Sequence, residues 1–371
     1  MSGTEGQEFL GNESAIVWQA RVETSQVGGR APLAALRPRG REALHGGLAA
    51  AAWAACGVFE RVALGYLSLS SALLVIFAEN LTHPVRLLVV HALVALLILA
   101  LCRAEANVWA DASICPRESM ELNGKHCHTA TQRFWHFWRH WYPHLFFLFC
   151  FEELGALVHL VSPRWQDAKL IAFDHGLTGV HPAIWLEQFA TPGRNEFMQF
   201  AYITYFLYLL VLGGVLYWRE DWKGYWSVMT YSAVAYAIGY VIAIFFPIES
   251  PWFAMAGAWH GQLRGGLFTS MINFIEDYGR VRGAAFPSEH VAGSIAALLG
   301  AWQHRRWLFW VMLPFVVCMC VSTVWGRYHY VADVFAGVIT GTLGYVIGKR
   351  VMRKWEEVGS RSTELESALS R

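Results

Sequence analysis

Two short segments of the chain hold residues that could act together on a phosphate ester. The first covers residues 286–290 (FPSEH) and the second covers residues 327–333 (RYHYVAD). They supply two histidines, an arginine, a serine and an aspartate, each set at the end of a long apolar stretch. Imidazole can attack phosphorus or carry a proton, and arginine and hydroxyl groups bind phosphate oxygens. The two segments therefore predict phosphoryl-transfer chemistry at one membrane surface.

The histidines suit different roles. His329 and Asp333 are four residues apart, a spacing that places both side chains on one face of a helix. A carboxylate bonded to one imidazole nitrogen fixes the tautomer and leaves the other nitrogen free to attack. His290 follows Pro287 and Ser288 at an expected helix start, where free N–H groups attract anions. We expect His329 to form a phosphohistidine, Asp333 to orient it, and His290 to act as acid and base.

Two further side chains are expected to bind the phosphate. Ser288 offers a hydroxyl donor, and Arg327 offers a forked, permanent positive charge. Together with the helix-start amides they stabilise charge on the equatorial oxygens. Since these groups take the role that Mg²⁺ has in other phosphoryl-transfer enzymes, no metal or other cofactor is expected.

Composition indicates a protein embedded in a membrane. Of the 371 residues 55% are hydrophobic and 15% are charged, whereas a soluble domain has about 25% charged residues. The net charge of +1 gives no reason to expect a nucleic acid partner. The predicted fold class is all-α, a polytopic helical bundle with about eight transmembrane helices. The apolar blocks lie at 62–78, 87–102, 145–161, 197–217, 227–246, 288–302, 308–324 and 330–348.

The placement of the basic residues predicts an orientation. With eight spans and the N-terminus inside, 21 of the 29 Lys and Arg residues fall on the inner side and 8 on the outer side. Because positively charged loops remain in the cytoplasm, both termini are expected there. Both motif segments then lie on the non-cytoplasmic face, which is periplasmic, extracellular or lumenal.

Four regions follow from this organisation. Residues 1–61 are expected to be a mobile cytoplasmic tail, and residues 349–371 a basic cytoplasmic tail. Residues 62–143 are expected to hold two transmembrane helices and an interfacial amphipathic helix, which begins near residue 131. Residues 144–348 are expected to form the phosphatase or phosphotransferase membrane core.

The motif segments resemble those of the type 2 phosphatidic acid phosphatase superfamily, integral membrane enzymes with a helical-bundle core. More narrowly, GAAFPSEH and STVWGRYHYVADVFAG are similar to the branch that includes inositol phosphorylceramide synthases. The resemblance extends over residues 174–348 and implies a six-helix core. It also implies the roles named above for the nucleophile, the acid and base, the orienting carboxylate and the phosphate binders, which are His329, His290, Asp333, Ser288 and Arg327.

The chain departs from the superfamily at two places. The superfamily has its second arginine six residues before the nucleophile, where this chain has Thr323; Arg327 shows the shift typical of the narrower branch. The first motif, with Lys and Arg before a Pro, is not evident, and its counterpart carries Trp252 where a basic residue is expected. Either Arg264, Arg280 or Arg282 compensates, or the donor is not a simple phosphomonoester. Arg282, shortly before Pro287, is the favoured phosphate binder.

The resemblance implies an enzyme that acts on a lipid phosphate ester, with a phospholipid or lipid phosphate as its partner. A lipid alcohol acceptor such as ceramide would make it a head-group transferase of the inositol phosphorylceramide synthase type, which the branch resemblance favours. Water as acceptor would make it a lipid phosphate or isoprenyl diphosphate phosphatase. A non-catalytic lipid-binding or lipid-moving protein and a metal-dependent membrane hydrolase are also compatible with a helical membrane bundle.

Two further groups of polar residues need an explanation. Glu152 and Glu153 lie inside the third predicted span, where a carboxylate pair needs a buried partner such as a histidine or arginine. A structural contact and a substrate contact are equally compatible with them. Residues 115–144 are rich in potential metal ligands, but their spacing matches no zinc pattern, and interfacial histidines explain them better. They are Cys115, His126, Cys127, His128, His136, His140 and His144.

Overall fold

The computed structural model describes residues 48–112, 129–279 and 281–369. Within these ranges every regular element is a helix, apart from one isolated bridge between Ile248 and Ala284. One compact unit covers Pro38–Trp355 and contains all the contacts considered below. Most of the predicted N-terminal tail, Arg280 and the predicted ligand residues at 115–128 lie outside the described residues.

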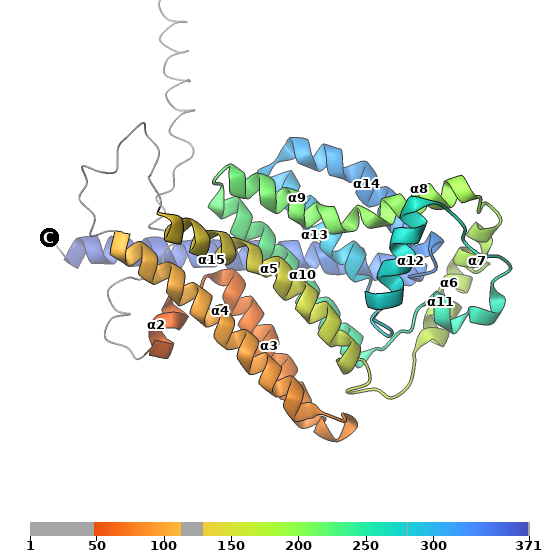
Figure 1. Cartoon of the computed structure of the whole chain (residues 1–371), viewed down its shortest axis with the longest axis horizontal. Coiled ribbons are helices and arrows are strands. Elements are labelled where there is room, and N and C mark those ends of the chain that lie inside the picture. The colour runs from red at the N-terminus through yellow and green to blue at the C-terminus, as the bar shows by residue number, and fades with distance from the viewer. Residues whose placement is uncertain (1–47, 113–128, 280, 370–371) are drawn as a thin grey trace, which may run out of the picture. The chain divides into compact units, whose positions relative to one another are not determined.

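Figure 1 shows the helices coloured in chain order. In chain order they are α2 (Leu48–Ala54), α3 (Val58–Ile76), α4 (Pro84–Ala112), α5 (Ala130–Leu157), α6 (Asp167–Thr178), α7 (Pro182–Glu187), α8 (Pro192–Ile203), α9 (Tyr205–Trp218), α10 (Trp222–Phe245), α11 (Pro251–Ala254), α12 (Leu267–Gly279), α13 (Glu289–His304), α14 (Arg306–Trp325) and α15 (Val331–Leu369). Two short 3-10 helices cover Ala78–Asn80 and Ala256–Ala258.

Six stretches of the described chain are long and apolar enough to cross a membrane. They are α3, the first part of α4, α8 with α9, α10, α14 and the first part of α15. The predicted all-α polytopic membrane bundle is therefore confirmed, and the chain is an integral membrane protein. The other two predicted blocks coincide with α13, which has 16 residues, and with the second half of α5.

We expected an interfacial helix followed by a separate third span. The structure instead joins both segments into the single helix α5 of 28 residues. Polar side chains in the N-terminal half of α5 find partners inside the protein and not at the membrane surface. Arg139 forms an ion pair with the fully buried Glu60 of α3, and its guanidinium lies 4.5 Å from the ring centre of Trp226. The Tyr142 hydroxyl donates to the same carboxylate at 2.8 Å. These contacts bind the segment to α3 and α10.

The two glutamates of α5 have different surroundings. Glu153 is buried and hydrogen-bonds Nε2 of His91 on α4, whose Nδ1 lies 2.7 Å from the Ser71 hydroxyl. This histidine is the kind of buried partner that the sequence required. Glu152, one residue earlier, faces a cavity that is described below. The structure thus gives Glu153 a structural contact and leaves Glu152 accessible.

Replacing His91 by leucine is expected to destabilise the protein, because the Glu153 carboxylate then stays buried without its partner. A buried polar group that loses its partner costs about 1–3 kcal/mol, and more when it is charged. Thermal unfolding in detergent measures the effect as a lower Tm. The exposed His83 provides the matched control, since His83→Leu removes no buried contact. An unchanged Tm in His91→Leu would contradict the structural role of the pair.

Close packing of α15 on α13 brings the two motif segments together. A Cβ atom on Gly337 would lie 2.7 Å from the Ser288 carbonyl oxygen, and one on Gly341 would lie 2.4 Å from the Ala292 carbonyl oxygen. Neither backbone oxygen can move away cheaply, so glycine is required at both positions for this approach. The helix starts that carry the two predicted motifs therefore lie side by side.

Candidate active site

The two predicted histidines face each other at neighbouring helix starts. Nε2 of His329 and Nδ1 of His290 are 3.3 Å apart. Nδ1 of His329 lies 2.9 Å from the Ala285 carbonyl oxygen and 3.3 Å from Oδ2 of Asp333. The structure thus places the three predicted catalytic side chains in one contiguous group.

The partners of His329 assign its tautomer. A carbonyl oxygen can only accept, so the Nδ1 atom near Ala285 carries the proton. The Nε2 lone pair is then directed at His290, whose other nitrogen lies 2.9 Å from the Tyr202 hydroxyl. Nε2 of His329 is therefore the atom that can attack phosphorus.

Asp333 reaches His329 in a different way from the helix-face pair that we expected. Helix α15 begins at Val331, so His329 precedes the helix and Asp333 lies in its first turn. The Asp333 carboxylate turns back over the helix start, where the Tyr330 N–H donates to it at 2.7 Å. An acidic side chain in the first turn commonly satisfies a free N–H in this way. The contact with His329 is therefore part of a helix cap.

A carboxylate that the sequence did not mark as functional holds the start of α15. Asp174 of α6 accepts hydrogen bonds from the Val331 N–H at 2.8 Å and the Ala332 N–H at 3.0 Å. Burial raises the pKa of the Asp174 carboxyl, and these two hydrogen bonds oppose the shift. Because His329 lies just before the capped turn, Asp174 positions the predicted nucleophile through the backbone.

Asp167, also on α6, fixes the neighbouring loop. Its carboxylate accepts from the Glu249 and Ser250 N–H groups, at 2.9 and 3.2 Å, and from the Tyr330 hydroxyl at 2.9 Å. Burial also raises the pKa of this carboxyl, against the hydrogen bonds that it accepts. The sequence signal that could have identified the two aspartates is their spacing of seven, which places them on one helix face.

Replacing Asp174 by alanine is expected to lower turnover about 10- to 100-fold, because a small displacement of a reacting group has effects of this size. The loss should appear in kcat, while lipid binding changes little. Steady-state kinetics in detergent measures both quantities. Asp277→Ala is the matched control, since Asp277 is exposed on α12. Equal kcat values for Asp174→Ala and the wild type would exclude a positioning role.

The three predicted phosphate binders have other partners in this structure. Ser288 is fully buried, and its hydroxyl accepts from the Val291 N–H at 3.4 Å as the N-cap of α13. Arg327 donates to Oε1 of Glu187 at 3.0 Å and to the Gly261 carbonyl oxygen at 2.8 Å. The cavity beside the histidines is lined by neither of them. To bind phosphate, Arg327 would therefore have to release its hydrogen bond to Glu187.

The remaining basic candidates are exposed. Arg282 has a side chain that is 57% exposed, and it forms an ion pair with Glu249 at the cavity wall. Its guanidinium also lies 4.8 Å from the ring centre of Phe253. Arg264 is exposed and does not line the cavity. The basic residue that compensates for Trp252 is thus still a prediction.

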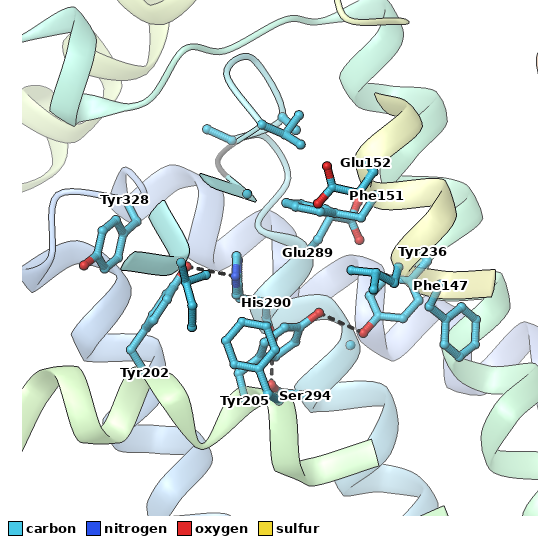
Figure 2. A pocket seen from close by; sticks show the side chains of 18 of the residues that line it. Phe147, Phe151, Glu152, Tyr202, Tyr205, Tyr236, Glu289, His290, Ser294 and Tyr328 are labelled. Atoms are coloured by element: carbon cyan, nitrogen blue, oxygen red, sulfur yellow. Dashed lines mark hydrogen bonds between the residues drawn. The ribbon is translucent and has the colours of Figure 1, made fainter. Parts of the chain in front are cut away.

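A cavity of about 440 Å³ opens beside the two histidines (Figure 2). Helices α5, α8, α9, α10, α12 and α13 contribute to its wall. Its lining is mostly aromatic and aliphatic, and it includes His290, His329 and several other polar side chains. Small-molecule sites typically combine a largely apolar wall with a few placed polar groups. The cavity therefore suits a molecule with an apolar body and a reactive polar end.

A second group of potential ligands lies on α4 and α5. Glu105, His136 and His140 have ligand atoms within 4.8 Å of one another. The Arg139 guanidinium lies 3.5 Å from Oε2 of Glu105, so the protein itself provides a cation for this carboxylate. His144, another of the predicted ligand-type histidines, lines the cavity instead.

Comparison with known proteins agrees with this geometry. Residues 168–347 match the family model of the PAP2 superfamily, and this stretch contains both histidines and Asp333. The chain is also 25% identical over 141 residues to the bacitracin transport permease protein BcrC of Bacillus licheniformis, a match that covers 38% of this chain and 63% of that protein. No solved structure matches. These matches support the predicted superfamily for residues 168–347, and neither match names the inositol phosphorylceramide synthase branch.

Proposed function

We propose that the chain, through its PAP2 superfamily domain, transfers phosphoryl groups from a lipid phosphate ester by way of a phosphohistidine. The contact of 3.3 Å between Nε2 of His329 and Nδ1 of His290, at the wall of an apolar cavity, carries this proposal. Members of the superfamily are generally phosphatases or phosphotransferases. The cavity wall supports a lipid as the substrate.

The first half-reaction breaks the ester bond. Nε2 of His329 attacks phosphorus, while His290 in its imidazolium form gives one proton to the departing alcohol oxygen and becomes neutral. The new phosphoimidazolium keeps its Nδ1 proton. The Nδ1–H donates hydrogen bonds to the Ala285 carbonyl oxygen and the Asp333 carboxylate. Because phosphorus must approach Nε2 of His329 while the ester oxygen approaches His290, the direct contact between the histidines has to open when substrate binds.

The second half-reaction restores the enzyme. Water or a lipid alcohol attacks phosphorus while its proton passes to His290, and the bond to His329 breaks. The free N–H groups at the start of α13, which Ser288 caps, would stabilise the phosphate oxygens. We propose that Arg327 joins them after it releases Glu187 and that Arg282 acts at the cavity wall.

Water and a lipid alcohol as acceptors lead to different enzymes. The branch resemblance favours head-group transfer to an alcohol such as ceramide, and hydrolysis is the alternative. The Bacillus licheniformis relative is named a transport permease, so a lipid-moving protein is a second candidate. The intact group of His290, His329 and Asp333 favours an enzyme. The excess of Lys and Arg on the predicted inner side supports cytoplasmic termini and a non-cytoplasmic active face.

Turnover of a lipid panel by the purified protein in detergent, with EDTA present, tests the proposal. The panel contains phosphatidic acid, an isoprenyl diphosphate, and phosphatidylinositol with and without ceramide. Free phosphate identifies a phosphatase, and a phosphorylated sphingolipid that requires the acceptor identifies a transferase. Activity that EDTA abolishes would favour a metal-dependent hydrolase. Absence of turnover for every lipid would favour the lipid-moving protein.

A further inference from the structure

Glu289 lies between the two predicted site residues of the first motif, yet the mechanism above does not use it. It is 2% exposed, and neither carboxylate oxygen has a hydrogen-bond partner among the described residues. It also lines the cavity together with His290. Buried polar groups in native proteins are nearly always hydrogen-bonded, and an exception calls for a specific explanation. A ligand in the cavity is one such explanation.

The protein makes room for this carboxylate. A Cβ atom on Gly239 of α10 would lie 1.7 Å from Oε1 of Glu289, so only glycine leaves the space that it occupies. The Tyr236 hydroxyl, one turn earlier on α10, lies close to Gly293 of α13 and 3.1 Å from the Tyr205 hydroxyl. Glu289 and the two tyrosines thus place polar atoms at one part of the cavity wall (Figure 2).

Glu289 is next to His290, and the alcohol part of the substrate leaves on the side of His290. In the proposed mechanism His329 attacks phosphorus from one side, and the alcohol oxygen leaves on the side of His290. The entering acceptor attacks from that same side, because it replaces the alcohol that left. Glu289 is the residue next to His290, and both side chains face one cavity. A group on the alcohol, close to its phosphate ester, would therefore lie in the cavity that the Glu289 carboxylate lines.

We propose that Glu289 binds a hydrogen-bond donor, a hydroxyl or amide N–H, on the alcohol component of the lipid. This inference rests on the proposed function and deepens it, because Glu289 then selects which lipid alcohols leave and enter. As a carboxylate, Glu289 offers only acceptor oxygens, so the ligand group in this proposal is a donor. A site that hydrogen-bonds a substrate hydroxyl discriminates strongly against an analogue without it, because its own polar group is then left unpaired.

A matched pair of lipids tests the inference. The first is a 1-acylglycerol 3-phosphate with a free 2-hydroxyl, and the second is its 2-deoxy analogue. We expect the wild type to prefer the hydroxyl lipid about tenfold or more in kcat/KM. Glu289→Leu should bring the ratio of the two values close to one, and Glu289→Gln should keep most of it. The ratio is measured on one preparation, so it does not depend on the fraction of folded protein.

Glu152→Leu is the matched control, because Glu152 lines the same cavity but is exposed. It should keep the wild-type ratio. Equal kcat/KM values for the two lipids in the wild type, or an unchanged ratio in Glu289→Leu, would overturn the inference. Those results differ from failure of the proposed function, in which the wild type turns over no lipid of the panel above or His329→Ala is as active as the wild type. If the wild type turns over the panel but neither of these two lipids, the thermal shifts described below provide the test.

A purely structural role of Glu289 predicts a different effect on the two kcat/KM values. The Tyr66 hydroxyl of α3 also has no hydrogen-bond partner among the described residues, and a bond between it and Glu289 would make both groups structural. Glu289→Leu would then affect both lipids equally, which contradicts the inference. If Glu289→Leu turns over neither lipid, thermal shifts with the two unphosphorylated alcohols decide the matter. We expect 1-acylglycerol to stabilise the wild type more than its 2-deoxy analogue does, and both alcohols to stabilise Glu289→Leu equally. Equal thermal shifts in the wild type would overturn the inference. An unchanged difference between the two alcohols in Glu289→Leu would also overturn it.

Discussion

His329→Ala is expected to lower turnover of a lipid phosphate by about 10³-fold or more, because it removes the nucleophile of the proposed mechanism. Among the described residues, His290 is the imidazole in contact with His329, and the proposed mechanism already uses it as the acid and base. The folded structure should persist, although His329 is buried, because the cap by Asp174 and the Tyr330–Asp333 contact do not involve its side chain.

Released phosphate measured in detergent at saturating lipid gives the size of this effect. His159→Ala is the matched control, because His159 is exposed and lies outside the cavity wall. An equal Tm for His329→Ala and the wild type separates lost chemistry from lost folding. Retention of more than about a tenth of the wild-type rate would contradict a covalent role for this histidine.

His290→Ala is expected to separate the two half-reactions. With an alkyl ester as substrate, turnover should fall about 10²- to 10⁴-fold, since the leaving oxygen no longer receives a proton. A p-nitrophenyl ester needs little protonation, so its first half-reaction should remain fast. The second half-reaction still lacks its base, and the phosphoenzyme should accumulate.

Isotope-labelled phosphate bound to the protein measures this intermediate. A phosphohistidine is labile in acid and stable in alkali, because its bond joins nitrogen to phosphorus. The label should appear in His290→Ala and be absent from the double variant that also carries His329→Ala. Label that survives in the double variant, or that behaves as an acyl phosphate, would assign the nucleophile to another residue.

Much of the fold could be predicted because a membrane imposes long apolar helices, which composition and block length reveal. The prediction was less successful for α5. Its mixture of basic and aromatic residues is typical of an interfacial helix, but Arg139 pairs with Glu60, a residue far away in the sequence. A pattern read along one segment does not contain the partner that a distant helix provides.

The same distinction applies to the site. The types and spacing of His290, His329 and Asp333 predicted the chemistry, because few arrangements other than phosphoryl transfer need this set at two helix ends. The sequence did not predict that Asp174 caps the start of α15, since more than 150 residues separate this carboxylate from the N–H groups it binds. It also did not reveal the contact of Arg327 with Glu187, which lies 140 residues earlier.

The sequence by itself therefore determined that the chain is a helical membrane protein, and it predicted which side chains carry the proposed chemistry, because hydropathy and residue type are local properties. Only the tertiary structure decided how those side chains meet. The histidine contact, the carboxylate of Glu289 and the cavity wall all depend on the close approach of α13 to α10 and α15. That approach depends on glycines, because a Cβ atom at these positions would clash with the neighbouring helix. The clash exists only in the packed structure.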